Sequence, residues 1–360
     1  MSNTCCTESI KMPHWADGIL ATSGGPVYRV STRWTRRDRV GQVRSRISTF
    51  RMAYTVEPGI YAVGNPSRES EIFVSANYKL SFDILRRELK GLNAWILVID
   101  TKGINVWCAA GKGTFGTEEL VSRMAKTGIA GLVDHRRIIV PQLGAPGVDA
   151  NLVKKESGFR VYYGPARASD IPAYLSSNYT ATREMRTVQF RLIDRLILTP
   201  IELNPLLKII PVFAMAVLLV FGLQPSGIVF MSAFTHGLPI FILGVIAILA
   251  GTLFTPVFLP FIPFRSFAIK GWLAGAILIF PYLYYIDWLV PGKILMTAFS
   301  FLFFPMVSSY LGLQFTGAST YTSLSGVKKE LKIGIPVYIS SGIASLVLLV
   351  IYKINEWGIV

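Results

Sequence analysis

A single cysteine stands among very small residues near the middle of the first half of the chain, in the run Asn105-Val106-Trp107-Cys108-Ala109-Ala110-Gly111-Lys112. A thiolate is a soft ligand that suits soft or borderline transition metals. Because Ala109, Ala110 and Gly111 add almost no side-chain bulk, a large flat cofactor could lie close to the backbone with the sulfur pointing at its metal. The run therefore predicts Cys108 as a metal ligand.

The ordinary alternative for a lone cysteine in apolar surroundings is a buried small residue. The other two cysteines, Cys5 and Cys6, are adjacent, and they are either a feature of the N-terminal tail or a means of delivering a soft metal ion. Three cysteines cannot form a disulfide framework, which agrees with a reducing compartment.

Short β-rich runs alternate with helical stretches between residues 58 and 180. We expect strands at 71–74, 95–99, 104–107, 137–140 and 159–163, and helices at 80–92, at 117–126 and, capped by Ser169, through Leu175. This alternation predicts a Rossmann-like α/β domain with a mostly parallel sheet. Ligands of such sheets bind beyond the carboxyl ends of the strands, and Cys108 would follow such an end.

Charge is very unevenly spread along the 360 residues. Residues 1–208 carry 29 Lys/Arg and 18 Asp/Glu, whereas residues 209–360 carry 7 and 3. The second part is too poor in charge for a soluble domain and predicts an all-α transmembrane domain at 204–360. We expect five spans, at about 204–223, 228–252, 271–290, 293–313 and 334–353.

Basic residues between these segments predict a multi-pass protein of the cytoplasmic (inner) membrane, with residues 1–203 cytoplasmic and the C-terminus outside. No N-terminal signal peptide is visible. Residues 1–54 are expected to be a basic, solvated arm, or one that touches anionic lipid or an acidic partner, and 181–203 an amphipathic connector on the lipid bilayer. No nucleic-acid motif accompanies the charge, so we expect no nucleic acid as a partner.

Other motifs are weaker. Gly111-Lys112-Gly113-Thr114-Phe115-Gly116 matches G-x-G-x-x-G, with Asp134 near the offset of a ribose-binding acid, but a dinucleotide fingerprint should directly follow a strand. The P-loop pattern fails, and so does the D-x-H-x-x-G cobalamin motif, because Asp134 and His135 are adjacent. His135 is expected to make surface contacts, and His236 to pack between helices or to act within a span.

Three segments together resemble the mercury-methylating corrinoid proteins of the HgcA family. They are the Cys108 run, the stretch from Val74 to Phe82, and Pro141-Gln142-Leu143-Gly144-Ala145-Pro146-Gly147. The third is also similar to the corrinoid domain of the corrinoid iron–sulfur protein of acetyl-CoA synthesis. The layout of a soluble corrinoid domain, here 55–180, followed by five spans matches as well, so the resemblance covers residues 55–360.

The resemblance implies a corrinoid (cobamide or cobalamin) cofactor with Cys108 as the lower axial ligand of its cobalt. It implies cofactor contacts at Ser75 and Ser81, where the family often has threonine, and at Asn105, Val106, Trp107, Cys108, Ala109, Ala110, Gly111, Lys112, Leu143, Gly144 and Ala168. Lys112 or the local helix N-terminus would help keep Cys108 ionised.

The implied activity is methylation of Hg(II). A methyl group from methyltetrahydrofolate, or from its methyltransferase, would be carried on cobalt, and a ferredoxin-like iron–sulfur partner (HgcB type) would return the cobalt to its reduced state. A thiolate donates more electron density than a neutral imidazole, which favours release of the methyl as a carbanion equivalent to an electrophile. The alternatives are a membrane-tethered corrinoid carrier that serves another enzyme and a nucleotide-dependent membrane oxidoreductase.

Overall fold

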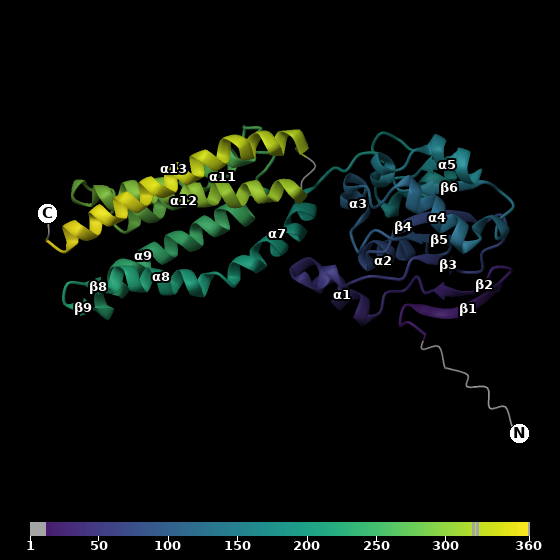
Figure 1. Cartoon of the computed structure of the whole chain (residues 1–360), viewed down its shortest axis with the longest axis horizontal. Coiled ribbons are helices and arrows are strands. Elements are labelled where there is room, and N and C mark those ends of the chain that lie inside the picture. The colour runs from purple at the N-terminus through teal and green to yellow at the C-terminus, as the bar shows by residue number, and fades with distance from the viewer. Residues whose placement is uncertain (1–11, 319–320, 322–323, 359–360) are drawn as a thin grey trace, which may run out of the picture. The chain divides into compact units, whose positions relative to one another are not determined.

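The computed structural model describes residues 12–318, 321 and 324–358. The chain divides into two compact units, one ending at Gln189 and one beginning at Phe190, and each is described by itself (Figure 1).

The first unit is built on a seven-stranded sheet with the strand order β1-β2-β3-β5-β4-β6-β7. The β2–β3, β4–β5, β4–β6 and β6–β7 pairs are parallel, and the β1–β2 and β3–β5 pairs are antiparallel, so the prediction of a mostly parallel sheet is confirmed. The strands are β1 (Ala16–Thr22), β2 (Gly25–Val30), β3 (Gly59–Val63), β4 (Glu71–Ala76), β5 (Ala94–Ile99), β6 (Arg137–Val140) and β7 (Arg160–Tyr163).

Helices cover both faces of this sheet, because successive side chains of a strand point to opposite sides. In β5, Trp95, Leu97 and Ile99 join the core that also contains residues of α3 (Val106–Lys112), α4 (Thr117–Thr127) and α5 (Ala150–Ser157). Ile96 and Val98 join the core on the other face, with α2 (Lys79–Glu88) and α6 (Ile171–Ser176). The result is a three-layer α/β/α unit.

Several local predictions are wrong. The strand expected at 104–107 is absent, since Asn105 is the N-cap of α3. Ser169 caps no helix; it lies in a 3-10 turn (Ala168–Asp170), and α6 begins at Ile171. The helix expected over 80–92 ends at Glu88, and within the connector expected at 181–203 the helix α7 begins only at Leu192.

Residues 12–54 are not a separate arm. They supply β1 and β2 of the sheet and α1 (Arg36–Ile47), whose buried positions are Asp38, Gly41 and Ser45. None of these three side chains is a large apolar one, so α1 has no hydrophobic stripe by which its sequence could be read as helical. Gly41 is required for close packing, because a Cβ there would lie 2.2 Å from the hydroxyl of Tyr54.

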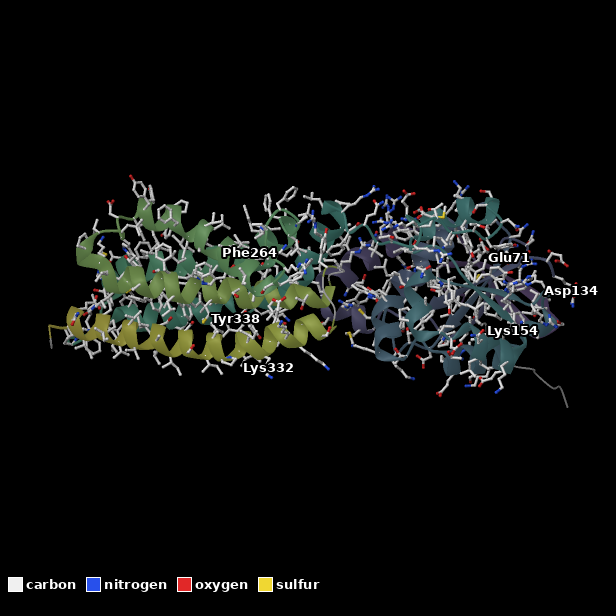
Figure 2. The ribbon with its side chains drawn as sticks, turned by 90° about the horizontal axis from the view of Figure 1, so that it is seen from above. Glu71, Asp134, Lys154, Phe264, Lys332 and Tyr338 are labelled. Carbon is white, nitrogen blue, oxygen red and sulfur yellow. The ribbon has the colours of Figure 1, made fainter. Side chains whose placement is uncertain are left out.

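The second unit is helical. It consists of α7 (Leu192–Leu207), α8 (Ile210–Gly222), α9 (Phe230–Leu249), α10 (Thr255–Val257), α11 (Phe267–Tyr285), α12 (Ile294–Gln314) and α13 (Leu324–Glu356), with a small hairpin of β8 (Leu223–Gln224) and β9 (Gly227–Ile228). Carbon dominates its side chains, whereas oxygen and nitrogen are dense over the first unit (Figure 2).

Four helical segments of the described residues are long and apolar enough to cross a membrane: Phe230–Val257, Phe267–Tyr285, Pro291–Gly317 and Ser325–Glu356. The first span expected, at 204–223, falls instead on the pair α7 and α8, which is bent by 45°. The bend has a cause in the sequence, because Pro211 cannot donate a hydrogen bond back to the carbonyl of Leu207. Five spans result only if this pair crosses as one.

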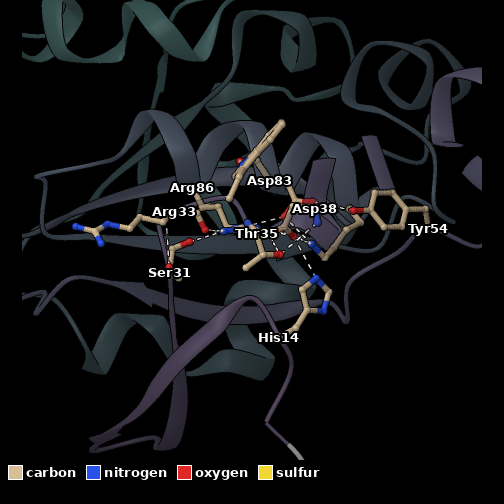
Figure 3. A network of polar contacts seen from close by, with 10 residues as sticks. His14, Ser31, Arg33, Thr35, Asp38, Tyr54, Asp83 and Arg86 are labelled. Atoms are coloured by element: carbon tan, nitrogen blue, oxygen red, sulfur yellow. Dashed lines mark hydrogen bonds and ion pairs between the residues drawn. The ribbon is translucent and has the colours of Figure 1, made fainter. Parts of the chain in front are cut away.

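A buried ion network holds α1 against α2 (Figure 3). Asp38 Oδ1 forms ion pairs with Arg86 Nη2 at 2.8 Å and with Lys79 Nζ at 3.4 Å, while Asp83 Oδ1 lies 2.6 Å from Lys79 Nζ and 2.8 Å from Arg86 Nε. All four side chains are at most 3% exposed. His14 Nε2 lies 3.2 Å from Asp38 Oδ1.

Burial by itself raises the pKa of Asp38, but the hydrogen bonds from Thr35 and the charges of Arg86 and Lys79 outweigh it and hold that pKa well below its usual range. Because the folded pKa lies below the unfolded value of 3.8, the stabilisation is fully present above about pH 4 and is lost as the pH falls further.

We expect Asp38→Asn to destabilise the protein by about 3–5 kcal/mol at pH 7, because two buried cations then share the single carboxylate of Asp83 and one positive charge is left without a counter-charge. Asp17→Asn is the matched control. The exposed ion pair of Asp17 with Arg29 contributes at most about 1 kcal/mol to the free energy of unfolding. Denaturant unfolding of both variants, followed between pH 3 and 7, measures the difference. Equal stabilities would contradict a structural role of the network.

Candidate functional site

A cavity of about 310 Å³ opens beyond the carboxyl ends of β4, β6 and β7. These strands are mutually parallel neighbours, so their ends meet at one edge of the sheet. Ser75 lies at the end of β4, Pro141 and Leu143 follow β6, and Gly164 to Ala166 follow β7. Side chains of α2 and α6 close one side, and the first residues of α3 another.

Seven of the residues predicted to contact a cofactor line this cavity together. They are Ser75, Ser81, Asn105, Val106, Trp107, Leu143 and Ala168. The remaining lining is mostly apolar, including Phe73, Ile84, Leu85, Ile139 and Ile171. An apolar cavity with a few polar groups at fixed places is the usual form of a cofactor site.

The helix that carries Cys108 is short and firmly bounded. The side chain of Asn105 accepts the Cys108 N–H at 2.9 Å, which satisfies an N–H group of the first turn. Gly113 ends the helix in the left-handed conformation, with φ of 81°, which an L side chain adopts only with strain. The chain therefore makes two turns of helix here and no more.

Ala109 and Ala110 do not face the cavity. They are buried in the sheet core, where α3 packs on the turn Gln142–Gly147. Gly144 is also a packing residue, since a Cβ there would lie 2.4 Å from the ring of Phe115. The small size of these three residues lets α3 approach this turn closely, and that they contact a cofactor stays a prediction.

Cys108 lies on the opposite, outer face of α3 and is half-buried. It does not line the cavity but directly follows Trp107, which does and is 37% exposed. Gly111 and Lys112, three and four residues further, share this face and are exposed. A Cβ on Gly111 would meet no atom within 4 Å, so the surface beside the sulfur is open.

Among the described residues, no three His, Cys, Asp or Glu side chains are grouped so that they could hold a metal ion. A metal at Cys108 would thus have at most one further ligand among these side chains, and its remaining ligands would have to come with it. This donor set suits a metal already enclosed in a macrocycle.

The glycine run does not form a dinucleotide site. Gly113 ends α3 and Gly116 is the N-cap of α4, so the run joins two helices and follows no strand. Asp134 forms an exposed pair with Arg68 at 2.6 Å. His135 accepts the N–H of Arg137 and lies 3.0 Å from the carbonyl of Ser70, and His236 lies 3.2 Å from Glu356.

Sequence reasoning missed Asn77, which directly follows β4 and is buried. Its Oδ1 accepts the N–H of Thr101 at 3.0 Å, the hydroxyl of Thr101 at 2.8 Å and the N–H of Gly103 at 2.9 Å. These bonds fix the loop between β5 and α3, and thus where Asn105 begins the Cys108 helix. A polar residue right after a buried strand was the signal that could have revealed it.

The family model of the CO dehydrogenase/acetyl-CoA synthase delta subunit matches residues 44–175, which contain the cavity and the whole of α3. The gamma subunit of the acetyl-CoA decarbonylase/synthase complex of Methanothermobacter thermautotrophicus is 30% identical over 166 residues, 46% of this chain and 34% of that protein. The large subunit of the corrinoid/iron–sulfur protein of Moorella thermoacetica is 29% identical over 125 residues, 34% of this chain and 28% of that protein.

The α/β unit is similar to corrinoid proteins of acetyl-CoA metabolism. The likeness to the corrinoid iron–sulfur protein expected from the sequence is thereby confirmed, but the narrower likeness to the mercury-methylating family is not. The chain spans only about a quarter to a third of the length of the curated relatives it matches.

We expect Asn77→Ala to destabilise the β5–α3 loop by at least about 2 kcal/mol, because two buried N–H groups lose their acceptor. Hydrogen–deuterium exchange of residues 100–108 should rise. Asn151→Ala, an exposed position on α5, is the control and should leave this exchange unchanged. Unchanged protection in the Asn77 variant would show that the loop is held by other contacts.

Proposed function

We propose that this chain is a membrane-anchored corrinoid protein that carries a methyl group for transfer to an acceptor. The observation that supports it best is the cavity at the carboxyl edge of the sheet, with Cys108 beside it on the open face of α3. The similarity to corrinoid proteins covers this same region.

The residues present fit a corrinoid. The mostly apolar cavity has room for an edge or a substituent of the ring, and the hydroxyls of Ser75 and Ser81 and the amide of Asn105 offer hydrogen bonds to its polar groups. The open surface at Gly111 leaves space for a broad flat molecule against α3. Cys108 would be the protein ligand of the metal.

The protein's own contribution is to position the sulfur. Buried Ala109 and Ala110 fix one face of α3, so the thiol on the other face has a set direction. Exposed Lys112 lies one turn beyond Cys108 on that face. A bound corrinoid would supply the cobalt chemistry of methyl transfer.

A second, narrower candidate is methyl transfer to Hg(II), and the presence of Cys108 in place of a histidine favours it. A negatively charged ligand pushes more electron density toward a group leaving for an electrophile than a neutral imidazole does. Under this proposal the partners are a ferredoxin-like iron–sulfur protein as reductant, and methyltetrahydrofolate or its methyltransferase as donor. The Moorella relative is itself named a subunit of a corrinoid/iron–sulfur protein.

The test of the carrier function is corrinoid uptake by the full chain under anaerobic, reducing conditions. We expect the wild type to retain cobalt and to show a thiolate-ligated visible spectrum, and Cys108→Ala to lose that spectrum. Cys5→Ala/Cys6→Ala is the control and should keep it.

A second pair of variants tests the cavity in the same uptake experiment. Ala168→Trp fills the cavity and should weaken uptake at least about tenfold, a loss of about 1.4 kcal/mol. Ala173→Trp, on the exposed side of α6, should not. Wild-type spectra in both Cys108→Ala and Ala168→Trp would refute the site.

The test of the narrower candidate uses the wild type loaded with methylated corrinoid, with reductant and Hg(II) but no further protein. Methylmercury should form, and at least about tenfold more slowly with Cys108→Ala, which corresponds to about 1.4 kcal/mol in the barrier. A loaded protein that forms none, yet gives up its methyl group to a second protein, would be a carrier only.

A further inference from the structure

A second cavity, of about 770 Å³, lies within the helical unit between α11, α12 and α13, far along the chain from the Cys108 site. It is larger than the first, and the proposed function makes no use of it. The inference below concerns the helical unit alone and does not depend on whether the first unit binds a corrinoid.

The polar groups of this cavity gather at one end. Arg265 and Ser266 precede α11, and Lys329 and Glu330 lie near the start of α13. Neither Arg265 nor Lys329 forms an ion pair with another described residue, and both are exposed. Two cations at one mouth are therefore left to attract an anion.

Glu330, the carboxylate at this end of the cavity, already accepts hydrogen bonds from the protein. Glu330 Oε2 accepts the hydroxyl of Ser266 at 2.8 Å and the N–H of Ala268 at 3.0 Å. It thus caps the first turn of α11, and its charge is directed to that helix N-terminus. Because the Glu330 carboxylate is directed at the N-terminus of α11, the positive charges of Arg265 and Lys329 dominate the mouth of the cavity.

Away from this mouth the cavity is mainly apolar. From Lys329 to Ser341 it follows α13 for thirteen residues, which is about 18 Å of helix. The facing walls carry Trp272 from α11 and Leu302 and Met306 from α12. Half-buried Tyr338 hydrogen-bonds Ser309 at 3.0 Å and forms part of the floor, whereas Lys332 is exposed and does not line the cavity (Figure 2).

We propose that this cavity binds one anionic phospholipid, with its phosphate at Arg265 and Lys329 and an acyl chain along Trp272, Met306 and Val337. The pattern of a cationic mouth and a long apolar trough matches an amphiphile with a charged head. The three helices are each long and apolar enough to span a membrane, so the molecules around them are lipids. Basic pockets between spans are a known way to hold anionic headgroups.

The experiment is native mass spectrometry of the full chain released from nanodiscs made of equal parts of a phosphatidylglycerol and a phosphatidylcholine. We expect the wild type to retain one phosphatidylglycerol in preference to phosphatidylcholine. Arg265→Gln/Lys329→Gln should lower this retention about 25-fold, because each of the two cations near a headgroup contributes about a fivefold preference.

Lys328→Gln/Lys332→Gln is the matched control, because it removes the same charge from neighbouring turns outside the cavity. It should keep the bound phosphatidylglycerol. Met306→Trp, which fills the trough without changing charge, should lower retention as the Arg265/Lys329 pair does. Circular dichroism confirms that each variant is folded.

Three results would overturn the proposal. One is equal loss in the two charge variants, which would show a diffuse attraction to the basic surface. Another is unchanged retention in both the Arg265/Lys329 variant and the Met306 variant. The third is equal retention of the two lipids by the wild type, which would show a purely apolar groove.

Discussion

The candidate site depends on the close approach of α3 to the turn that follows β6. Ala109 and Ala110 are buried there, and Gly144 and Gly147 leave no room for a Cβ beside Phe115. A Cβ on Gly147 would lie only 2.1 Å from the carbonyl oxygen of Phe115 and 3.2 Å from Cα of Ala110. A bulkier residue at any of these positions would lift the helix and move the thiol on its outer face away from the cavity. The small residues of the motif thus act through packing.

This contact also shows how far the sequence could be read. The small residues around Cys108 predicted that a flat cofactor lies close to the backbone, and that stays a prediction; the sequence did not predict that Ala109 and Ala110 pack against the turn at 142–147. Only the three-dimensional arrangement separates the buried face of α3 from its open face. The predicted strand at 104–107 failed for a related reason: four apolar-rich residues before a cysteine look like a strand until Asn105 is seen to cap a helix.

Elements with a long hydrophobic pattern were predicted well. The strand β5 and the helix α4 lie within a residue or two of their expected bounds, because burial on both faces or along one stripe leaves a clear record in the sequence. The first 54 residues have no such hydrophobic pattern. There, a helix buries Asp38 and Ser45, and the partners that make such burial favourable, Lys79 and Arg86, come some forty to fifty residues later. The sequence alone does not distinguish a charged residue at the surface from one that is paired in a buried network.

How often the helical unit would cross a membrane depends on a local break between two of its helices. The thirteen residues of α8 reach about 20 Å, short of the roughly 30 Å of a hydrocarbon core, so α8 cannot cross alone. A crossing needs the last turns of α7, across the break at Lys208 and Ile209. With that bent pair the chain crosses five times and its ends lie on opposite sides; without it, four crossings bring both ends to one side. The placement of the C-terminus is therefore decided at this break, and the four longer helices do not determine it.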